Sequence, residues 1–301
     1  MLRPTPCTVR SDCRSPRLSR WPGKPPLSSQ SPGGLAPRFV SRIERFDRVG
    51  STQAVVGGWL DDGIDEVCVV VADEQTGGRG RLDRVWQSSP GRALLVSAGF
   101  RPGTLPLSQA WRLPAIASIA MLGAATSLLG PTADRLALKW PNDIVAVHHG
   151  GLLKIAGVLT DGVPEGDHMA TSVVGLGINV DWPKSDFPPE LASSMWSLSE
   201  ASGGRRLDRD ALLTGWLVRL EPLYESLRAG HFDSLRWADA QITTGAAVVV
   251  ETGSETISGT AVGVDHDSGS LLVRLGPGIP LRTVAHGDVV RTQVNDAASS
   301  L

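Results

Sequence analysis

Short apolar runs rich in β-branched residues constrain the fold of this 301-residue chain most strongly. The runs "DEVCVVVA" (65–72) and "RALLVSAGF" (92–100) predict buried strands, because their apolar residues are continuous rather than alternating. The turn "HHGG" (148–151) separates two later runs and predicts a hairpin. Between these strands, the Ala-rich stretch 107–130 predicts an internal helix that Pro114 either kinks or starts.

Two changes of composition divide the chain into three predicted segments. Residues 1–40 are rich in Pro, Ser and Arg, and such a segment buries too little apolar surface to fold. We expect a disordered tail there, although its composition is also typical of a transit peptide. After residue 240, short strand-like runs alternate with Gly-bearing turns, which predicts a small β-barrel domain at 241–295. The segment 41–240 is then one larger domain.

Composition and charge exclude several functional classes. A net charge of −2 provides no broad positive surface for nucleic acid. The three cysteines have neither the spacing of a metal site nor a predicted disulfide, so we expect a cytoplasmic protein. No uninterrupted apolar run approaches the roughly 20 residues of a membrane span, which predicts no membrane association. Because no metal-binding motif is present either, we predict no metal site built from protein ligands alone.

The densest positive charge lies in the stretch "DEQTGGRGRLDRVW" (73–86), at the end of a predicted strand. Glycines allow close approach of backbone to a ligand, and arginines are donors suited to phosphate and carboxylate. A large ring beside such donors suits a purine. The candidate residues are Gly77, Gly78, Gly80, Arg79, Arg81, Arg84 and Trp86.

Further polar residues lie on or beside apolar strands farther along the chain. Two lysines are flanked by apolar neighbours, and a lysine in such a place is costly unless its charge is used. Taken singly, Lys139 is equally compatible with a strand-end lysine that reaches water, and for Lys154 and Asn179 a purely structural role is favoured. The set consists of Lys139, Asn142, Asp143, Lys154 and Asn179.

Together these residues predict a site for an anionic ligand that carries a nucleotide. A carboxylate activated by ATP fits, because two anions brought together need cations to offset their repulsion. No residue of the set resembles a covalent nucleophile, so we expect direct attack of the carboxylate on the α-phosphate. A loop closing over the mixed anhydride would protect it from water.

The order of motifs over residues 43–292 resembles that of biotin–protein ligases. The motifs are "GST", "EQTGGRGR…W", "KWPND", "K-x-AGVL" and "G-x-GIN". The resemblance implies an α+β fold, with a mixed-sheet catalytic domain related to class II aminoacyl-tRNA synthetases and a small C-terminal β-barrel. It implies that biotin and ATP, with Mg²⁺, form biotinyl-5′-AMP, and that biotin passes to one lysine of a biotin carboxyl carrier protein or domain of an acyl-CoA or pyruvate carboxylase. The Pro-rich N-terminal segment predicts a form without a DNA-binding domain.

The resemblance also implies roles for individual residues. Lys139 and Arg79 are implied to be catalytic, because they neutralise charge as the biotin carboxylate approaches ATP. Trp86 is implied to pack on adenine, and Gln53 stands where the family has Asn in a biotin contact. The implied biotin-binding residues are Ser51, Thr52, Gln53, Gln75, Gly78, Arg79, Gly80, Arg81 and Lys139. The implied ATP-binding and adenylate-binding residues are Arg81, Arg84, Trp86, Asn142, Lys154 and Asn179.

Three alternatives remain open at this point. A lipoate– or octanoate–protein ligase has the same fold, although the pair "GRGR…W" and "KWPND" favours biotin. A non-catalytic sensor of biotin or nucleotide would keep the pocket without turnover, which the intact set of Arg79, Arg81 and Lys139 disfavours. Nucleic-acid binding by the small barrel is disfavoured because that segment has no basic stripe with exposed aromatic residues.

Overall fold

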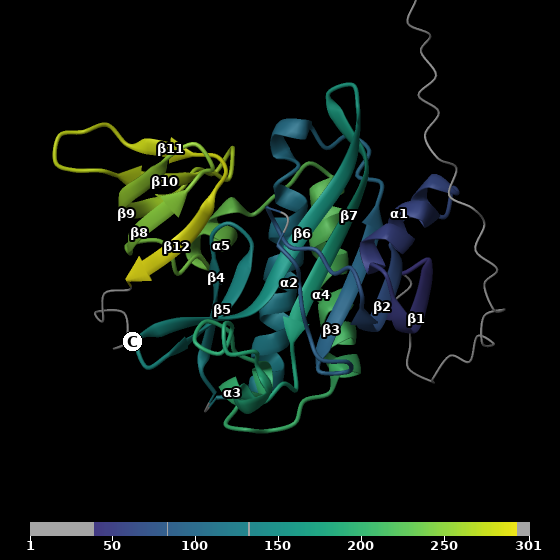
Figure 1. Ribbon diagram of the computed structural model, residues 1–301. Helices are drawn as coiled ribbons and strands as arrows, with labels where there is room; N and C mark the ends of the chain where they lie inside the picture. Colours follow the sequence, from purple (N-terminus) through teal and green to yellow (C-terminus); the bar gives the residue numbers. More distant parts are fainter. Residues whose placement is uncertain (1–38, 83, 132, 294–301) are drawn as a thin grey trace, which may run out of the picture. The chain divides into compact units, whose positions relative to one another are not determined.

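The computed structural model describes residues 39–82, 84–131 and 133–293, which lie in one compact unit (Figure 1). Almost all of the predicted tail, 1–40, therefore lies outside the described residues. The prediction that this segment holds no DNA-binding domain concerns the same residues and stays a prediction. The boundary predicted near residue 240 stays a prediction.

The larger sheet has seven strands in the order β1-β2-β3-β7-β6-β5-β4. Only β1 and β2 pair in parallel among these neighbours, so the sheet is mixed. As predicted, the turn after His148 joins β5 to β6 in a hairpin. The strands are β1 (Arg42–Val49), β2 (Cys68–Gln75), β3 (Ala93–Phe100), β4 (Arg135–Lys139), β5 (Asp143–His148), β6 (Gly151–Glu165) and β7 (His168–Asn179).

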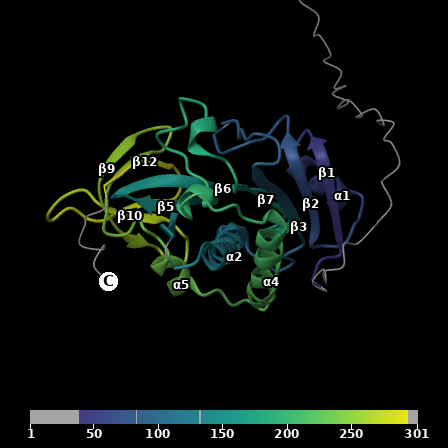
Figure 2. The same ribbon diagram turned by 90° about the horizontal axis from the view of Figure 1, so that it is seen from below.

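Helices cover both faces of this sheet, which is why its strands are apolar on both sides. Successive strand residues point to opposite faces, so Val69 packs in the core with α2 and α4 while Cys68 packs against α1. Figure 2 shows α2 and α4 side by side on one face. The helices are α1 (Thr52–Asp61), α2 (Arg112–Leu129), α3 (Leu198–Ala201), α4 (Arg209–Arg228) and α5 (Ser234–Asp239), with short 3₁₀ turns η1 (Leu107–Gln109) and η2 (Lys184–Asp186).

The predicted internal helix begins at Arg112, so Pro114 lies in its first turn. Proline is tolerated there because the N–H groups of the first turn have no partner within the helix. The segment Leu107–Leu129 is long and apolar enough to cross a membrane by composition alone. However, 61% of its most apolar window is buried inside the fold, which is the behaviour of a core helix.

The predicted small C-terminal β module is an antiparallel sheet of five strands in the order β11-β10-β9-β8-β12. Together with the mixed sheet and its helices, it confirms the predicted α+β fold. Its strands are β8 (Ala247–Glu251), β9 (Thr256–Val264), β10 (Leu271–Arg274), β11 (Arg282–Val284) and β12 (Asp288–Gln293).

Candidate active site

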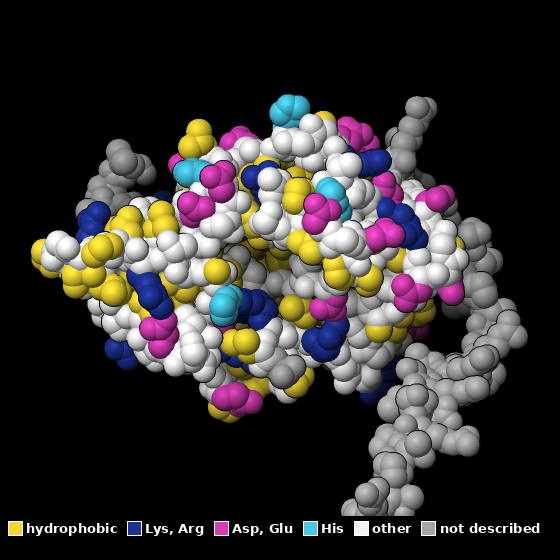
Figure 3. Space-filling view, turned by 90° about the horizontal axis from the view of Figure 1, so that it is seen from above, with side chains coloured by type: hydrophobic (Ala, Val, Ile, Leu, Met, Phe, Trp, Pro, Cys, Tyr) yellow, Lys and Arg dark blue, Asp and Glu magenta, His cyan; other side chains and the backbone are white. Residues whose placement is uncertain are grey.

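A cavity of about 410 Å³ lies over the sheet face that carries α1. Small residues on β3, β6 and β7 form its floor: Ser97, Gly157, Gly175 and Gly177. They make room for larger side chains, since a Cβ on Gly175 would lie 2.7 Å from Gln53 Cδ. In the space-filling view, Lys and Arg side chains lie around a hollow near the middle of the surface (Figure 3).

One end of the cavity is a neutral hydrogen-bonding network at the start of α1. The Thr52 backbone N–H donates to Gln75 Oε1 at 2.7 Å, and Thr52 Oγ1 lies 2.7 Å from Ser97 Oγ. Gln53 is buried, and its Nε2 donates to the Leu159 carbonyl at 3.2 Å. Ser51, which the sequence also predicted here, instead caps α1 by accepting from the Ala54 N–H and does not line the cavity.

The Gly- and Arg-rich loop after β2 folds back on itself beside the cavity. The Gly80 N–H donates to the Arg84 carbonyl at 2.6 Å, and the Trp86 N–H donates to the Gly78 carbonyl at 3.0 Å. A side chain on Gly78 would not fit, because its Cβ would lie 2.5 Å from the Trp86 carbonyl oxygen. Gly78 therefore shapes the loop without lining the cavity.

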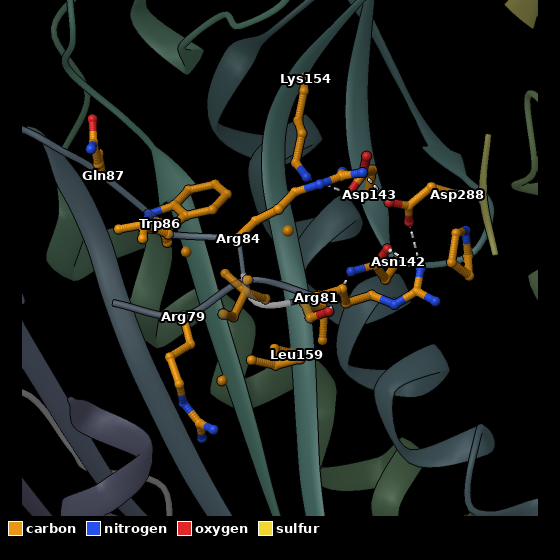
Figure 4. Close-up of a pocket in the computed structure, with 18 of the residues that line it drawn as sticks. Arg79, Arg81, Arg84, Trp86, Gln87, Asn142, Asp143, Lys154, Leu159 and Asp288 are labelled. Atoms are coloured by element: carbon orange, nitrogen blue, oxygen red, sulfur yellow. Dashed lines mark hydrogen bonds and ion pairs between the residues drawn. The ribbon is translucent and has the colours of Figure 1, made fainter. Parts of the chain in front are cut away.

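The side chains of the three loop arginines point in two directions (Figure 4). Arg79 points away from the other two and forms an ion pair with Asp161 on β6. Arg81 and Arg84 both reach Asp288 at the start of β12, at 3.0 Å and 2.5 Å respectively. The structure thus brings Arg81 and Arg84 together around one carboxylate, and the sequence had not indicated Asp288.

Lys139 on β4 and Lys154 on β6, two strands on either side of β5, also line the cavity and together with Arg81 and Arg84 form what we call its positive wall. Lys139 Nζ donates to the Val289 carbonyl at 2.6 Å, and Lys154 Nζ forms an ion pair with Asp143 at 2.7 Å. Burial lowers the pKa of Lys139 below its ordinary value, and the neighbouring Asp143 carboxylate offsets part of that shift. Asn142 also lines the cavity, where its Nδ2 donates to the Val158 carbonyl at 2.7 Å.

The other end of the cavity is apolar and centres on Trp86. Its indole lies on the glycine floor, because a Cβ on Gly177 would meet Trp86 Cε2 at 2.5 Å and one on Gly157 would meet Cζ3 at 3.3 Å. Leu191 and Met195 line the cavity near this ring. The Trp86 Nε1 is buried and has no hydrogen-bond partner among the described residues.

Asn179 lies at the end of β7 and is fully buried without lining the cavity. Its Nδ2 donates to the Trp196 carbonyl at 3.1 Å, while its Oδ1 has no partner in the part of the chain that the structure describes. Asn179 is therefore buried in the fold and does not belong to the cavity lining.

Sequence reasoning missed several residues that line the cavity: Ser97, Leu191, Met195, Asp288, Val289 and Val290. None belongs to a motif that the sequence displays. The hydrogen bond from Arg81 to Asp288 joins residues 207 positions apart in the chain, and no pattern in the sequence connects these two positions.

Comparison with known proteins adds an independent observation. The model of the "Biotin/lipoate A/B protein ligase family" matches residues 46–179. The chain is 34% identical over 265 residues to the bifunctional ligase/repressor BirA of Bacillus spizizenii, which covers 87% of this chain and 78% of that protein. It is 30% identical over 279 residues to the biotin–[acetyl-CoA-carboxylase] ligase of Mycobacterium tuberculosis, and this match covers 89% of this chain and 96% of that protein. The structure of biotin protein ligase from Aquifex aeolicus in complex with biotin and ATP matches with a TM-score of 0.67 at 25% identity, covering 82% of this chain and 96% of that one.

Proposed function

Because this chain belongs to the biotin–protein ligase family, we propose that the cavity beside the Arg-rich loop holds biotin and ATP while they react. The chain is an ATP-dependent ligase that activates biotin as biotinyl-5′-AMP and transfers it to a lysine of a biotin carboxyl carrier domain. The convergence of Arg81, Arg84 and Lys139 on one wall of the cavity carries the assignment of the site.

The neutral end of the cavity suits the biotin rings. Biotin carries a ureido group that both donates and accepts hydrogen bonds, and the hydroxyls and amides of Thr52, Gln53, Gln75 and Ser97 supply both kinds of partner. From there the biotin carboxylate extends toward Lys139. Gln53 is one methylene longer than Asn, and the bare floor at Gly175 accommodates that extra length.

The positive wall supplies the charge that the first step requires. A carboxylate oxygen of biotin attacks the α-phosphorus of ATP, and the bond from that phosphorus to the pyrophosphate oxygen breaks. Lys139, Arg81 and Arg84 offset the repulsion between the two anions, which is the main obstacle to their approach. Arg79 would join them by leaving its exposed ion pair with Asp161. In the second step the acceptor amine attacks the acyl carbon, AMP leaves with the bonding electrons, and the amine loses a proton.

Magnesium would enter this site with the nucleotide. Within residues 39–293, apart from positions 83 and 132, no group of three or more His, Cys, Asp or Glu side chains could hold a metal ion. Mg²⁺ commonly binds through one or two carboxylates together with substrate phosphates, and Asp143 lines the cavity to serve as such a ligand. When bound, Mg²⁺ would supply charge neutralisation for the departing pyrophosphate.

The apolar end of the cavity suits adenine, which leads to a prediction about Gly177. The substitution Gly177→Ala places a methyl group 2.5 Å from Trp86 Cε2 and must displace the indole. We expect the KM for ATP to rise about tenfold, since base–aromatic stacking contributes roughly 1–3 kcal/mol, while the KM for biotin changes little. Steady-state pyrophosphate exchange measures both constants.

The matched control is Gly58→Ala, because a Cβ at that helical position meets nothing within 4 Å. It should leave both constants unchanged. An unchanged KM for ATP in Gly177→Ala would mean that adenine does not use this floor.

The lowered pKa of Lys139 predicts the alkaline limit of activity. As the pH rises through that lowered pKa, Lys139 loses the charge that holds the anionic substrates, so the KM for ATP should rise at a pH below the ordinary lysine value of 10.5. Lys139→Arg should move this limit to higher pH, because guanidinium keeps its charge. A pH profile of KM tests this, and identical alkaline limits in the two proteins would rule out Lys139 as the titrating group.

The deciding experiment for the function is biotin-dependent ATP–pyrophosphate exchange, with lipoate and octanoate as competing acids. Exchange with biotin alone is expected. Exchange with lipoate or octanoate instead would assign the chain to the lipoate-transferring relatives on this fold. Tight biotin binding without any exchange would favour the sensor.

For the transfer step we propose a carrier domain of an acyl-CoA or pyruvate carboxylase as the partner, rather than DNA. We also propose a cytoplasmic location, since Cys68, the cysteine within the described residues, is free and buried.

A further inference from the structure

Residues 287–289, where β12 begins, contact three of the cations that line the cavity. Arg81 Nη1 donates to the Gly287 carbonyl at 3.1 Å and to Asp288 Oδ1 at 3.0 Å. Arg84 forms an ion pair with the same carboxylate, and Lys139 Nζ donates to the Val289 carbonyl at 2.6 Å. One short segment of the C-terminal module thus contacts all three cations.

The chemistry of this segment resembles that of a bound phosphate. It presents one carboxylate and two carbonyl oxygens, all acceptors, to donors that are suited to anions. The Asp288 side chain is only 14% exposed, so solvent screens its charge weakly, whereas Arg84 is 62% exposed. While these contacts last, Asp288 offsets one of the three positive charges, each cation has an acceptor of this segment as a partner, and an incoming triphosphate would meet a negative charge at Asp288.

The backbone of this segment packs closely against the small sheet. Gly287 adopts a φ of 149°, and a Cβ there would lie 2.8 Å from the Glu251 carbonyl oxygen on β8. β12 is also paired with β8 from Asp288 onward. The Asp288 carboxylate is therefore held by the small sheet, and the loop arginines are the partners that can move.

We propose that the segment 287–289 is an internal substitute for the substrate anions, which Arg81 and Arg84 exchange for the phosphates of ATP. Asp288 is then a positioning residue that holds the loop beside the cavity in the free enzyme and competes with nucleotide for it. This inference rests on the proposed function for the identity of the anion. Because Asp288 and phosphate would occupy the same arginines, removing the competing carboxylate should strengthen phosphate binding.

The test is Asp288→Asn, which removes the charge and keeps the size. We expect the Kd for inorganic pyrophosphate, measured by calorimetry on the full chain, to fall about fivefold, the lower end of typical coupling, because Arg84 is exposed to screening. We also expect the KM for ATP in pyrophosphate exchange to fall, with kcat changed less than KM. The matched control is Glu255→Gln, which removes an exposed ion pair with Arg282 from the same module and should change neither constant.

The outcomes separate the possibilities. Equal or weaker pyrophosphate binding by Asp288→Asn, in a variant that unfolds at the same temperature as the wild type, overturns the competition. An increased KM together with a reduced kcat would also overturn it, because Asp288 would then orient the arginines for catalysis. If the wild type shows no biotin-dependent exchange, the proposed function fails, yet the pyrophosphate Kd still decides whether Asp288 competes with phosphate.

Discussion

Replacing Lys139 with methionine is expected to reduce the rate of biotin-dependent ATP–pyrophosphate exchange by about 10²–10³-fold, the usual effect of removing one group that stabilises developing charge. Methionine keeps an unbranched apolar side chain of similar length, with a sulfur in place of one methylene, and removes the ammonium group. The effect is large because the pKa of Lys139 is lowered chiefly by burial, and in a site shielded from water a charge interacts more strongly.

The conservative control is Lys139→Arg, which keeps the charge but replaces a compact ammonium with a planar fork. It should retain more activity than Lys139→Met at neutral pH. An exchange rate within about threefold of wild type in a folded Lys139→Met protein would remove Lys139 from the catalytic step, since electrostatic groups of this kind contribute far more.

Replacing Trp216 with alanine is expected to lower the free energy of unfolding by about 3–5 kcal/mol. Trp216 on α4 is fully buried, and its Nε1 donates to the Ala117 carbonyl on α2 at 3.1 Å. Its loss leaves a large cavity between the two helices that support the sheet. Native proteins are stable by only about 5–15 kcal/mol. This single change should therefore lower the unfolding temperature and raise the unfolded fraction of the protein.

Urea unfolding measures this loss, and Val218→Ala is the matched control. Val218 lies on the same helix with its side chain 52% exposed, so its truncation should cost less than about 0.5 kcal/mol. Equal effects of the two substitutions would mean that the contact between α2 and α4 adds little to stability.

The elements of the fold were predictable because each depends on neighbouring residues. The continuous run at β2 and the Gly-bearing turn between β5 and β6 both carry local signals. The start of α2 was less well defined, because Pro114 is compatible with either a kink or a first turn. The structure places it in the first turn.

The site was only partly predictable. Thr52, Gln75, Arg81, Trp86 and Lys139 lie in recognisable motifs, and all five line the cavity. Ser51 and Asn179 lie in equally recognisable motifs, yet Ser51 caps α1 and Asn179 is buried without lining the cavity. A motif identifies a residue type at a position in the chain, but the direction of its side chain depends on packing.

The sequence alone therefore indicated the buried strands β2 and β3, the hairpin of β5 and β6, the internal helix α2, the family and the chemistry of the loop, because periodicity, turn residues and charge act over short distances along the chain. Only the tertiary structure decided which groups meet. The strand order places β3, β7 and β6 side by side, and their bare residues Ser97, Gly175 and Gly157 become one floor. The tertiary structure also brings Asp288 to Arg81, which lies 207 positions away in the chain. No local signal specifies this contact, because it forms only when the whole chain has packed.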